Sequence, residues 1–179
     1  MNSIKQYIDT DRLILRSWTE GDISEFARMN NDGRVMEYFL KKLSYNETVD
    51  FYNRIQAEFD TCGFGLYAVE EKQSKAFIGY VGLHQITFDI HFAPAVEIGW
   101  RLLPEFWNRG YATEAALACL DYAKTELGLN EICSFTSLLN KPSERVMQKI
   151  GMQRIEEFNH PLVEPDNRLY RHVLYKIQL

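Results

Sequence analysis

The sequence has little cysteine, little proline and no long apolar run, and each shortage argues against a class of protein. The three cysteines, Cys62, Cys119 and Cys133, are odd in number and lack the paired spacing of metal ligands, which argues against a disulfide framework and against a metal site. Five prolines among 179 residues and 46% apolar residues argue against a disordered chain. No apolar stretch approaches membrane-spanning length, and the N-terminus lacks the apolar core of a signal peptide. We expect a soluble, cytoplasmic protein in which Cys119 and Cys133 are buried and reduced.

Clustered positive charge is also missing. The net charge is −5 and no run of lysine or arginine occurs, which argues against a nucleic-acid partner. An acidic balance agrees with a positively charged substrate, but it is also the usual way for a protein to stay soluble. Without repeats, linkers or low-complexity segments, residues 1–179 are expected to form a single domain.

The residue patterns predict alternating strands and helices after a polar lead-in of ten residues. Strands are expected at residues 13–18, 64–69, 76–86, 96–102, 131–136, 152–158 and 169–177. Helices are expected after residue 19, after the N-cap residue Ser44, after Gly110 and over residues 140–150, with a further short helix around residues 35–40. This order predicts a mixed α/β chain with βαβ units in its C-terminal half.

The segment 97–114 is the most informative part of the chain. A strand ends at Pro104, and an Arg109-Gly110 turn opens a helix whose inward face is built mainly of small residues: Ala112, Ala115, Ala116, Cys119, Leu120 and Ala123. A helix that begins at a glycine directs unpaired backbone N–H groups and the positive end of its dipole outward, which suits a phosphate. The same residues are also compatible with an ordinary tight turn.

Four motifs in this order resemble the RimJ/RimL-like branch of the GNAT superfamily of acetyl-CoA-dependent N-acetyltransferases, the ribosomal-protein-alanine acetyltransferase type. They are TDRLILR at residues 10–16, PEFWNRGYATEA at residues 104–115, NKPS with VMQKIGM at residues 140–152, and HVLY at residues 172–175. The resemblance spans nearly the whole chain. One departure is Trp107, because the wider family often has Gln or Arg three residues before the glycine.

The resemblance implies a single-domain α/β (α+β) GNAT-like fold. Its mixed, mostly antiparallel central sheet would have about six or seven strands flanked by about four helices, with the fourth and fifth strands splayed apart. A bulge near residues 100–103 would admit pantetheine, and backbone N–H groups of the loop would hold the pyrophosphate. The implied acetyl-CoA-binding residues are Trp100, Leu102, Leu103, Asn108, Arg109, Gly110, Tyr111, Ala112, Thr113, Asn140 and Ser143.

The resemblance also implies direct attack of an amine on acetyl-CoA, with Glu97 and Ser143 as the catalytic residues. Glu97 is the only carboxylate in an apolar strand, where partial burial could raise its pKa into the range of a useful base. Its alternative role is a structural pair with an arginine. Ser143 matches a serine thought to protonate the leaving thiolate; the alternatives are a simple CoA contact, or satisfying a backbone group in a helix that Asn140 caps.

His84 and His91 have no partner at the spacing of metal ligands. His172 is expected to be a packed residue of the last strand, and His160 could border the entrance for the acceptor. The acceptor is expected to be a protein N-terminus or a small amine, and the protein a monomer or homodimer without membrane partners. A non-catalytic acyl-CoA-binding or sensing module is the alternative; a Rossmann-type nucleotide-binding domain lacks its glycine fingerprint here.

Overall fold

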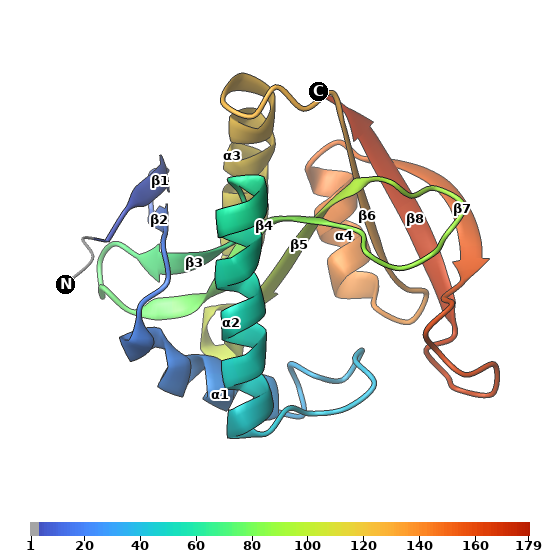
Figure 1. Ribbon diagram of the computed structural model, residues 1–179, viewed down its shortest axis with the longest axis horizontal. Coiled ribbons are helices and arrows are strands. Elements are labelled where there is room, and N and C mark those ends of the chain that lie inside the picture. Colours follow the sequence, from blue (N-terminus) through green and yellow to red (C-terminus); the bar gives the residue numbers. More distant parts are fainter. Residues whose placement is uncertain (1–3) are drawn as a thin grey trace.

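The computed structural model describes residues 4–179 as four α-helices, two short 3-10 helices and an eight-stranded sheet (Figure 1). The strands are β1 (Gln6–Asp9), β2 (Leu13–Arg16), β3 (Leu66–Glu71), β4 (Phe77–Gln85), β5 (Val96–Leu102), β6 (Glu131–Ser137), β7 (Gln153–Asn159) and β8 (Arg171–Gln178). The helices are η1 (Glu20–Asp22), α1 (Ile23–Asn31), α2 (Tyr45–Cys62), η2 (Pro104–Phe106), α3 (Tyr111–Thr125) and α4 (Lys141–Lys149). The predicted α/β class and the four main helices are confirmed.

The sheet has the order β1-β2-β3-β4-β5-β6-β8-β7, and all its pairs are antiparallel except β5 with β6. β1 and β2 lie at one end of the molecule and β7 and β8 at the other (Figure 1). Among residues 4–179, the one parallel pair therefore lies inside the sheet, between two antiparallel halves. It joins the predicted fourth and fifth strands, where the splay was expected.

Helices cover both faces of the sheet, as alternation along β3 shows. Tyr67 and Val69 belong to a core cluster with residues of α3 and α4, whereas Leu66 and Ala68 pack with residues of α1 and α2. Most of the small residues predicted to form the inward face of α3, among them Ala115 and Cys119, are fully buried against the sheet, whereas Ala112 in the first turn is partly buried. Cys119 and Cys133 are buried and free, as expected.

Two expectations about the N-terminal half were wrong. The lead-in contains β1, an edge strand paired with β2; its polar composition hid it, because an edge strand needs to bury few side chains. Residues 35–40 do not form a helix. Turns and bends replace it. Just before them the carboxylate of Asp32 accepts a hydrogen bond from the Arg34 backbone at 2.9 Å, a local bond of the kind that competes with helical pairing.

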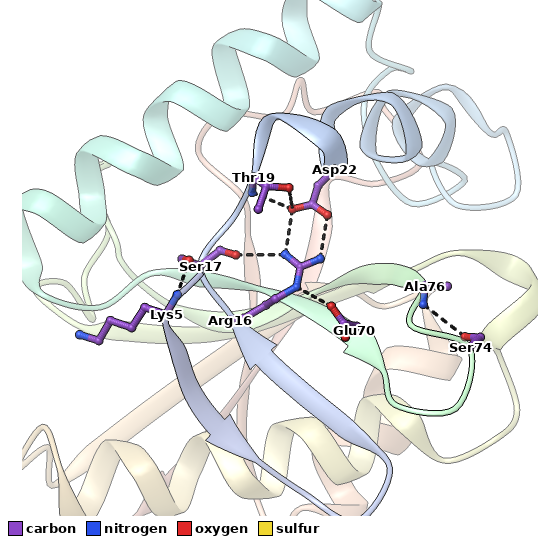
Figure 2. A network of polar contacts seen from close by, with 8 residues as sticks. All are labelled: Lys5, Arg16, Ser17, Thr19, Asp22, Glu70, Ser74 and Ala76. Atoms are coloured by element: carbon purple, nitrogen blue, oxygen red, sulfur yellow. Dashed lines mark hydrogen bonds and ion pairs between the residues drawn. The ribbon is translucent and has the colours of Figure 1, made fainter. Parts of the chain in front are cut away.

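The junction between β2, η1 and β3 is held by a buried ion-pair network centred on Arg16 (Figure 2). The Arg16 guanidinium donates two hydrogen bonds of 2.9 Å to the Asp22 carboxylate and a third, also 2.9 Å, to Glu70. It donates a further bond to the Ser17 carbonyl oxygen at 3.0 Å. The bonds to Asp22 are the largest cause of a raised pKa of Arg16, so this cation is locked in its charged form.

No helix in residues 4–179 is both long and apolar enough to cross a membrane.

Candidate active site

The site lies where β5 and β6 separate. Their one pair in register is Glu97 with Cys133, and the Ser134 hydroxyl donates a hydrogen bond to the Ile98 carbonyl oxygen at 2.9 Å beside it. Beyond this point the two strands diverge, and a cavity of ≈ 820 Å³ extends from the gap towards α2 on one side and α4 on the other. The strands therefore start to separate earlier than the predicted bulge at residues 100–103. The pairing of β5 with β4 also continues without a break to Leu102, so this bulge is not seen.

Glu97 lies in this cavity, and its partner is a histidine rather than the arginine considered above. Its side chain is largely buried, and its Oε2 lies 2.8 Å from Nε2 of His84, which stands opposite it on β4. Within residues 4–179, its second oxygen, Oε1, has no hydrogen-bond partner. The carboxylate is thus held on one side and open to the cavity on the other.

His84 carries a proton at neutral pH. Burial opposes its charged form, but the hydrogen bond and negative charge of Glu97, with the nearby Glu58, outweigh burial and raise the pKa of His84 to about 9. Glu58, on α2, accepts a hydrogen bond from the Gln85 backbone at 2.9 Å. The resulting group is one imidazolium between two carboxylates.

Ser143 and Trp100 face each other across the gap. The Trp100 indole on β5 donates a hydrogen bond to the Ser143 hydroxyl oxygen on α4 at 3.2 Å, and both residues line the cavity. Asn140 caps α4, because its side chain accepts a hydrogen bond from the Ser143 backbone at 3.3 Å. The expected capping is confirmed, and the Ser143 hydroxyl donates to no acceptor among residues 4–179, so its hydrogen can bond to a ligand.

The loop before α3 presents a row of backbone donors. Gly110 has φ 80°, a left-handed conformation that glycine adopts without strain, and Asn108 also has a positive φ of 59°. In the part of the chain that the structure describes, the backbone N–H groups from Asn108 to Thr113 have no acceptor; the first bond of the helix joins Glu114 to Gly110. This is the geometry that binds a phosphate at a helix N-terminus.

Arg12, in the first motif, braces this loop. Its guanidinium donates to the Glu114 carboxylate at 2.6 Å and to the Arg109 carbonyl oxygen at 2.8 Å, and its backbone N–H donates to Glu114 at 2.9 Å. The Thr10 hydroxyl adds a bond of 2.6 Å to Glu114. Partial burial opposes ionisation of Glu114, but these bonds prevail and hold its pKa below the usual range. Residues distant in sequence thus fix the start of α3.

Not every residue predicted to bind the cofactor reaches the cavity with its side chain. Leu102 and Leu103 are buried in the two core clusters, and Tyr111, the first residue of α3, is also buried. The Leu102 carbonyl oxygen is already used by the Trp107 indole, which donates to it at 2.8 Å and so ties the loop to the end of β5. Asn108 and Arg109 are exposed on the loop. Ala112 and Thr113 lie in the first turn of α3, where their backbone N–H groups remain available.

Sequence reasoning missed three features of the cavity. The first is His84, for which the sequence gives no signal of a contact with Glu97. The second is an aromatic wall that contains both His160 and His172. The third is Arg101, which is buried next to the cavity's aromatic lining. Within residues 4–179, no group of three or more His, Cys, Asp or Glu side chains could hold a metal ion.

The sheet opens between two parallel strands, and an anion-binding helix start lies beside the gap, as the resemblance implied for an enzyme that binds an acyl-CoA there. The family described as acetyltransferase (GNAT) domain matches residues 12–153. The chain therefore belongs to the GNAT acetyltransferases, enzymes that use acetyl-CoA as the acyl donor.

Similarity to known proteins in sequence and in structure agrees with this family assignment. The uncharacterized proteins YkkB and N-acetyltransferase YnaD of Bacillus subtilis are 31% and 30% identical over 93% and 96% of this chain, and over 98% and 96% of their own lengths. A GNAT-family acetyltransferase structure from Bacillus anthracis has a TM-score of 0.79 at 29% identity and covers 96% of this chain and 97% of its own. A spermidine N-acetyltransferase structure from Vibrio cholerae, in complex with CoA and spermine, has a TM-score of 0.75 at 23% identity, covering 94% and 96% of the two chains.

Proposed function

We propose that this acetyltransferase transfers the acetyl group of acetyl-CoA directly to a primary amine, with Glu97 receiving the amine proton. The observation that carries the proposal is the position of Glu97: a buried carboxylate at the point where β5 and β6 separate, fixed through one oxygen by His84 and open through the other. The motif resemblance adds the RimJ/RimL-like branch to the proposal, with residues 1–179 acting as one domain.

The cofactor's phosphates bind at the start of α3. The backbone N–H groups from Asn108 to Thr113 are the donors, with local positive charge from the exposed Arg109. The pantetheine arm lies between β5 and β6, alongside Trp100 and past the backbone of Leu102 and Leu103. It reaches Asn140 and Ser143 on the far side of the gap.

One proton of the substrate's ammonium group first passes to Oε1 of Glu97, which leaves a neutral amine. The amine nitrogen then forms a bond to the acetyl carbon as the carbon–sulfur bond breaks, and the second proton that the nitrogen loses goes to the CoA thiolate, which leaves as the thiol. His84 keeps Glu97 oriented and stays protonated at neutral pH, so it positions the base rather than accepting the proton itself. The Ser143 hydroxyl faces the departing sulfur; because a serine hydroxyl is a weak acid, its principal role is to hydrogen-bond the thiolate.

The test begins with binding and proceeds to turnover. Acetyl-CoA at about a hundred times its Kd stabilises a folded protein by roughly 2.7 kcal/mol, which a thermal-shift measurement detects. Thiol release is then measured over a panel of amines and amino-terminal peptides. Glu97→Gln is expected to lower kcat by about 10²–10⁴-fold without changing the acetyl-CoA shift, because the general base is lost while the cofactor contacts remain.

Glu126→Gln is the matched control, since Glu126 is an exposed carboxylate beyond the C-terminal end of α3. Its turnover is expected to equal that of the wild type. Unchanged kcat in Glu97→Gln at every pH would remove Glu97 from the mechanism. Acetyl-CoA binding with no transfer to any amine would favour the second candidate, a sensing module, which the free Oε1 of Glu97 beside the gap argues against.

The charge pattern bears on partners other than the cofactor and the acceptor. The net charge of −5, without a basic run, supports a proposal of no nucleic-acid or membrane partner. We also propose that the enzyme acts as a monomer or homodimer.

A further inference from the structure

One side of the cavity is an aromatic wall, which consists of Phe88, Phe135, His160 and His172. The residues come from four different segments, and their rings are closely packed: centroids lie 5.1 Å apart for Phe88 and His160, 5.8 Å for Phe135 and His160, and 4.7 Å for the two histidines. Phe92 and Phe158 support the wall from behind. Such a packed array is preformed rather than assembled by the ligand.

The wall is uncharged at neutral pH although half of its residues are histidines. Burial lowers the pKa of His160, and burial together with the neighbouring His160 lowers the pKa of His172 to about 4. At pH 7 both rings are neutral, so the wall offers flat, weakly polar surfaces. These suit an apolar or aromatic body.

The charged side chains that line the cavity cancel one another. Within residues 4–179 its only carboxylates are Glu58 and Glu97, and its cations at neutral pH are Arg54 and His84. Glu97 is needed for the amine that reacts, and Glu58 already faces His84 and the Gln85 backbone N–H. No carboxylate is left over for a second ammonium group.

Arg101 makes the local potential still less favourable to a second cation. Its guanidinium is buried beneath the ring of Phe39, 4.0 Å from the centroid, and close to the ring of Tyr80, and both aromatic residues line the cavity. It hydrogen-bonds the Asn30 amide oxygen at 2.6 Å, its Nε has no partner, and it makes no ion pair with any of residues 4–179. An uncompensated buried cation repels a polyamine and does not affect a neutral body.

Resting on the proposed function, we infer that the acceptor is a primary amine on an apolar, aromatic body without a second cationic group, which lies against the aromatic wall. The reacting nitrogen points to Glu97, and the product is the N-acetyl amide with release of CoA thiol. Two kinds of molecule carry a primary amine on such a body: a free arylalkylamine and a peptide that begins with an aromatic residue.

The experiment measures thiol release with acetyl-CoA at pH 7.5 for phenethylamine, a tripeptide beginning with Phe, the same tripeptide beginning with Gly, and spermidine. The kcat/KM of phenethylamine or of the Phe peptide is expected to exceed that of spermidine and of the Gly peptide by about tenfold or more. The better of the two aromatic acceptors identifies the source. A higher kcat/KM for spermidine or for the Gly peptide would overturn the inference while leaving acetyl transfer to amines intact; no transfer to any amine would overturn the proposed function itself.

Charge at the cavity mouth gives a second test. Leu162 lines the cavity and is 64% exposed, so Leu162→Glu adds a carboxylate there without disturbing the core. We expect it to lower the preference for phenethylamine over spermidine by about threefold or more, while Leu162→Gln and the exposed Leu117→Glu on α3, outside the cavity lining, leave the preference unchanged. An unchanged preference in Leu162→Glu would overturn charge balance as its cause.

Discussion

Arg16 and Arg101 are both strand arginines that are less than a tenth exposed, yet their surroundings differ completely. Arg16 meets two carboxylates, Asp22 and Glu70, as well as a carbonyl oxygen, and all three of its nitrogens donate (Figure 2). Arg101 meets one amide oxygen and aromatic rings, and its Nε is unpaired. Burial of a charge therefore does not by itself reveal its role.

The difference follows from position. Arg16 lies in the N-terminal half of the sheet, away from the cavity, where a desolvated charge has to be matched within the fold. Arg101 lies on β5, the strand that also carries Glu97, and next to residues that line the cavity. A charge left uncompensated there acts on whatever occupies the cavity, which is why its neighbourhood bears on the choice of acceptor.

The largest expected effect comes from making the same substitution at both positions. Arg16→Met leaves the buried Asp22 and the partly buried Glu70 without a counter-ion and is expected to lower the free energy of unfolding by about 3–5 kcal/mol. Arg101→Met removes an uncompensated charge and deprives only Asn30 of a donor, so a change of about 1 kcal/mol or less is expected. Urea unfolding of both variants measures the contrast. Equal losses would show that the two arginines are equally compensated, contrary to the geometry.

The next effect comes from giving Arg101 the partner that it lacks. Phe39, whose ring covers the guanidinium, is 42% exposed, so Phe39→Glu places a carboxylate near Arg101 at little risk to the core. The lost ring contact and the new ion pair are each worth about 1 kcal/mol or less, so stability is expected to change little. Cancelling the buried charge is expected to raise the kcat/KM of spermidine relative to phenethylamine by about tenfold.

Phe39→Gln serves as the control for this change. It removes the same ring but adds no charge, so it is expected to leave the ratio of the two acceptors close to its wild-type value. Equal ratios in the Glu and Gln variants would mean that Arg101 does not influence the acceptor.

Parts of the fold and site could be predicted because their signals are local in sequence. The small-residue spacing of α3 and the glycine at its start depend on neighbours within a few residues, and so does the alternation that put Glu97 on a strand face. The motif resemblance correctly identified the fourth and fifth predicted strands as the two that flank the gap. Hydrogen bonds from Arg12 to Arg109 and Glu114 join the first motif, residues 10–16, to the motif at residues 104–115.

The rest depends on register, which the local pattern does not contain. His84 meets Glu97 only because β4 and β5 pair with these residues opposite each other; a shift of one residue would turn His84 to the other face. The aromatic wall unites His160 and His172 with rings from two other segments, and the isolation of Arg101 is a property of all its neighbours together. Such features require the tertiary structure.

The smallest expected effect is a dependence of stability on pH. The ion pairs of Arg16 keep their charge at every pH tested, whereas the pair of His84 with Glu97 titrates. The folded pKa of His84 is about 9, above the ordinary value of about 6.5 expected in the unfolded chain, so its pair with Glu97 and Glu58 contributes full stability below pH 6.5. That contribution is lost as the pH rises towards and through 9. A third of the imidazole is exposed, so solvent screens the pair and the loss is expected to be smaller than for Arg16→Met.

The contribution of the His84 pair is isolated by measuring the free energy of unfolding of the wild type minus that of His84→Gln at pH 6.5 and pH 9.5. The difference should shrink at the higher pH, whereas the difference between the wild type and Arg16→Met should persist, because arginine keeps its proton throughout. A His84→Gln difference that is the same at both pH values would show that His84 holds Glu97 as a neutral hydrogen-bond donor.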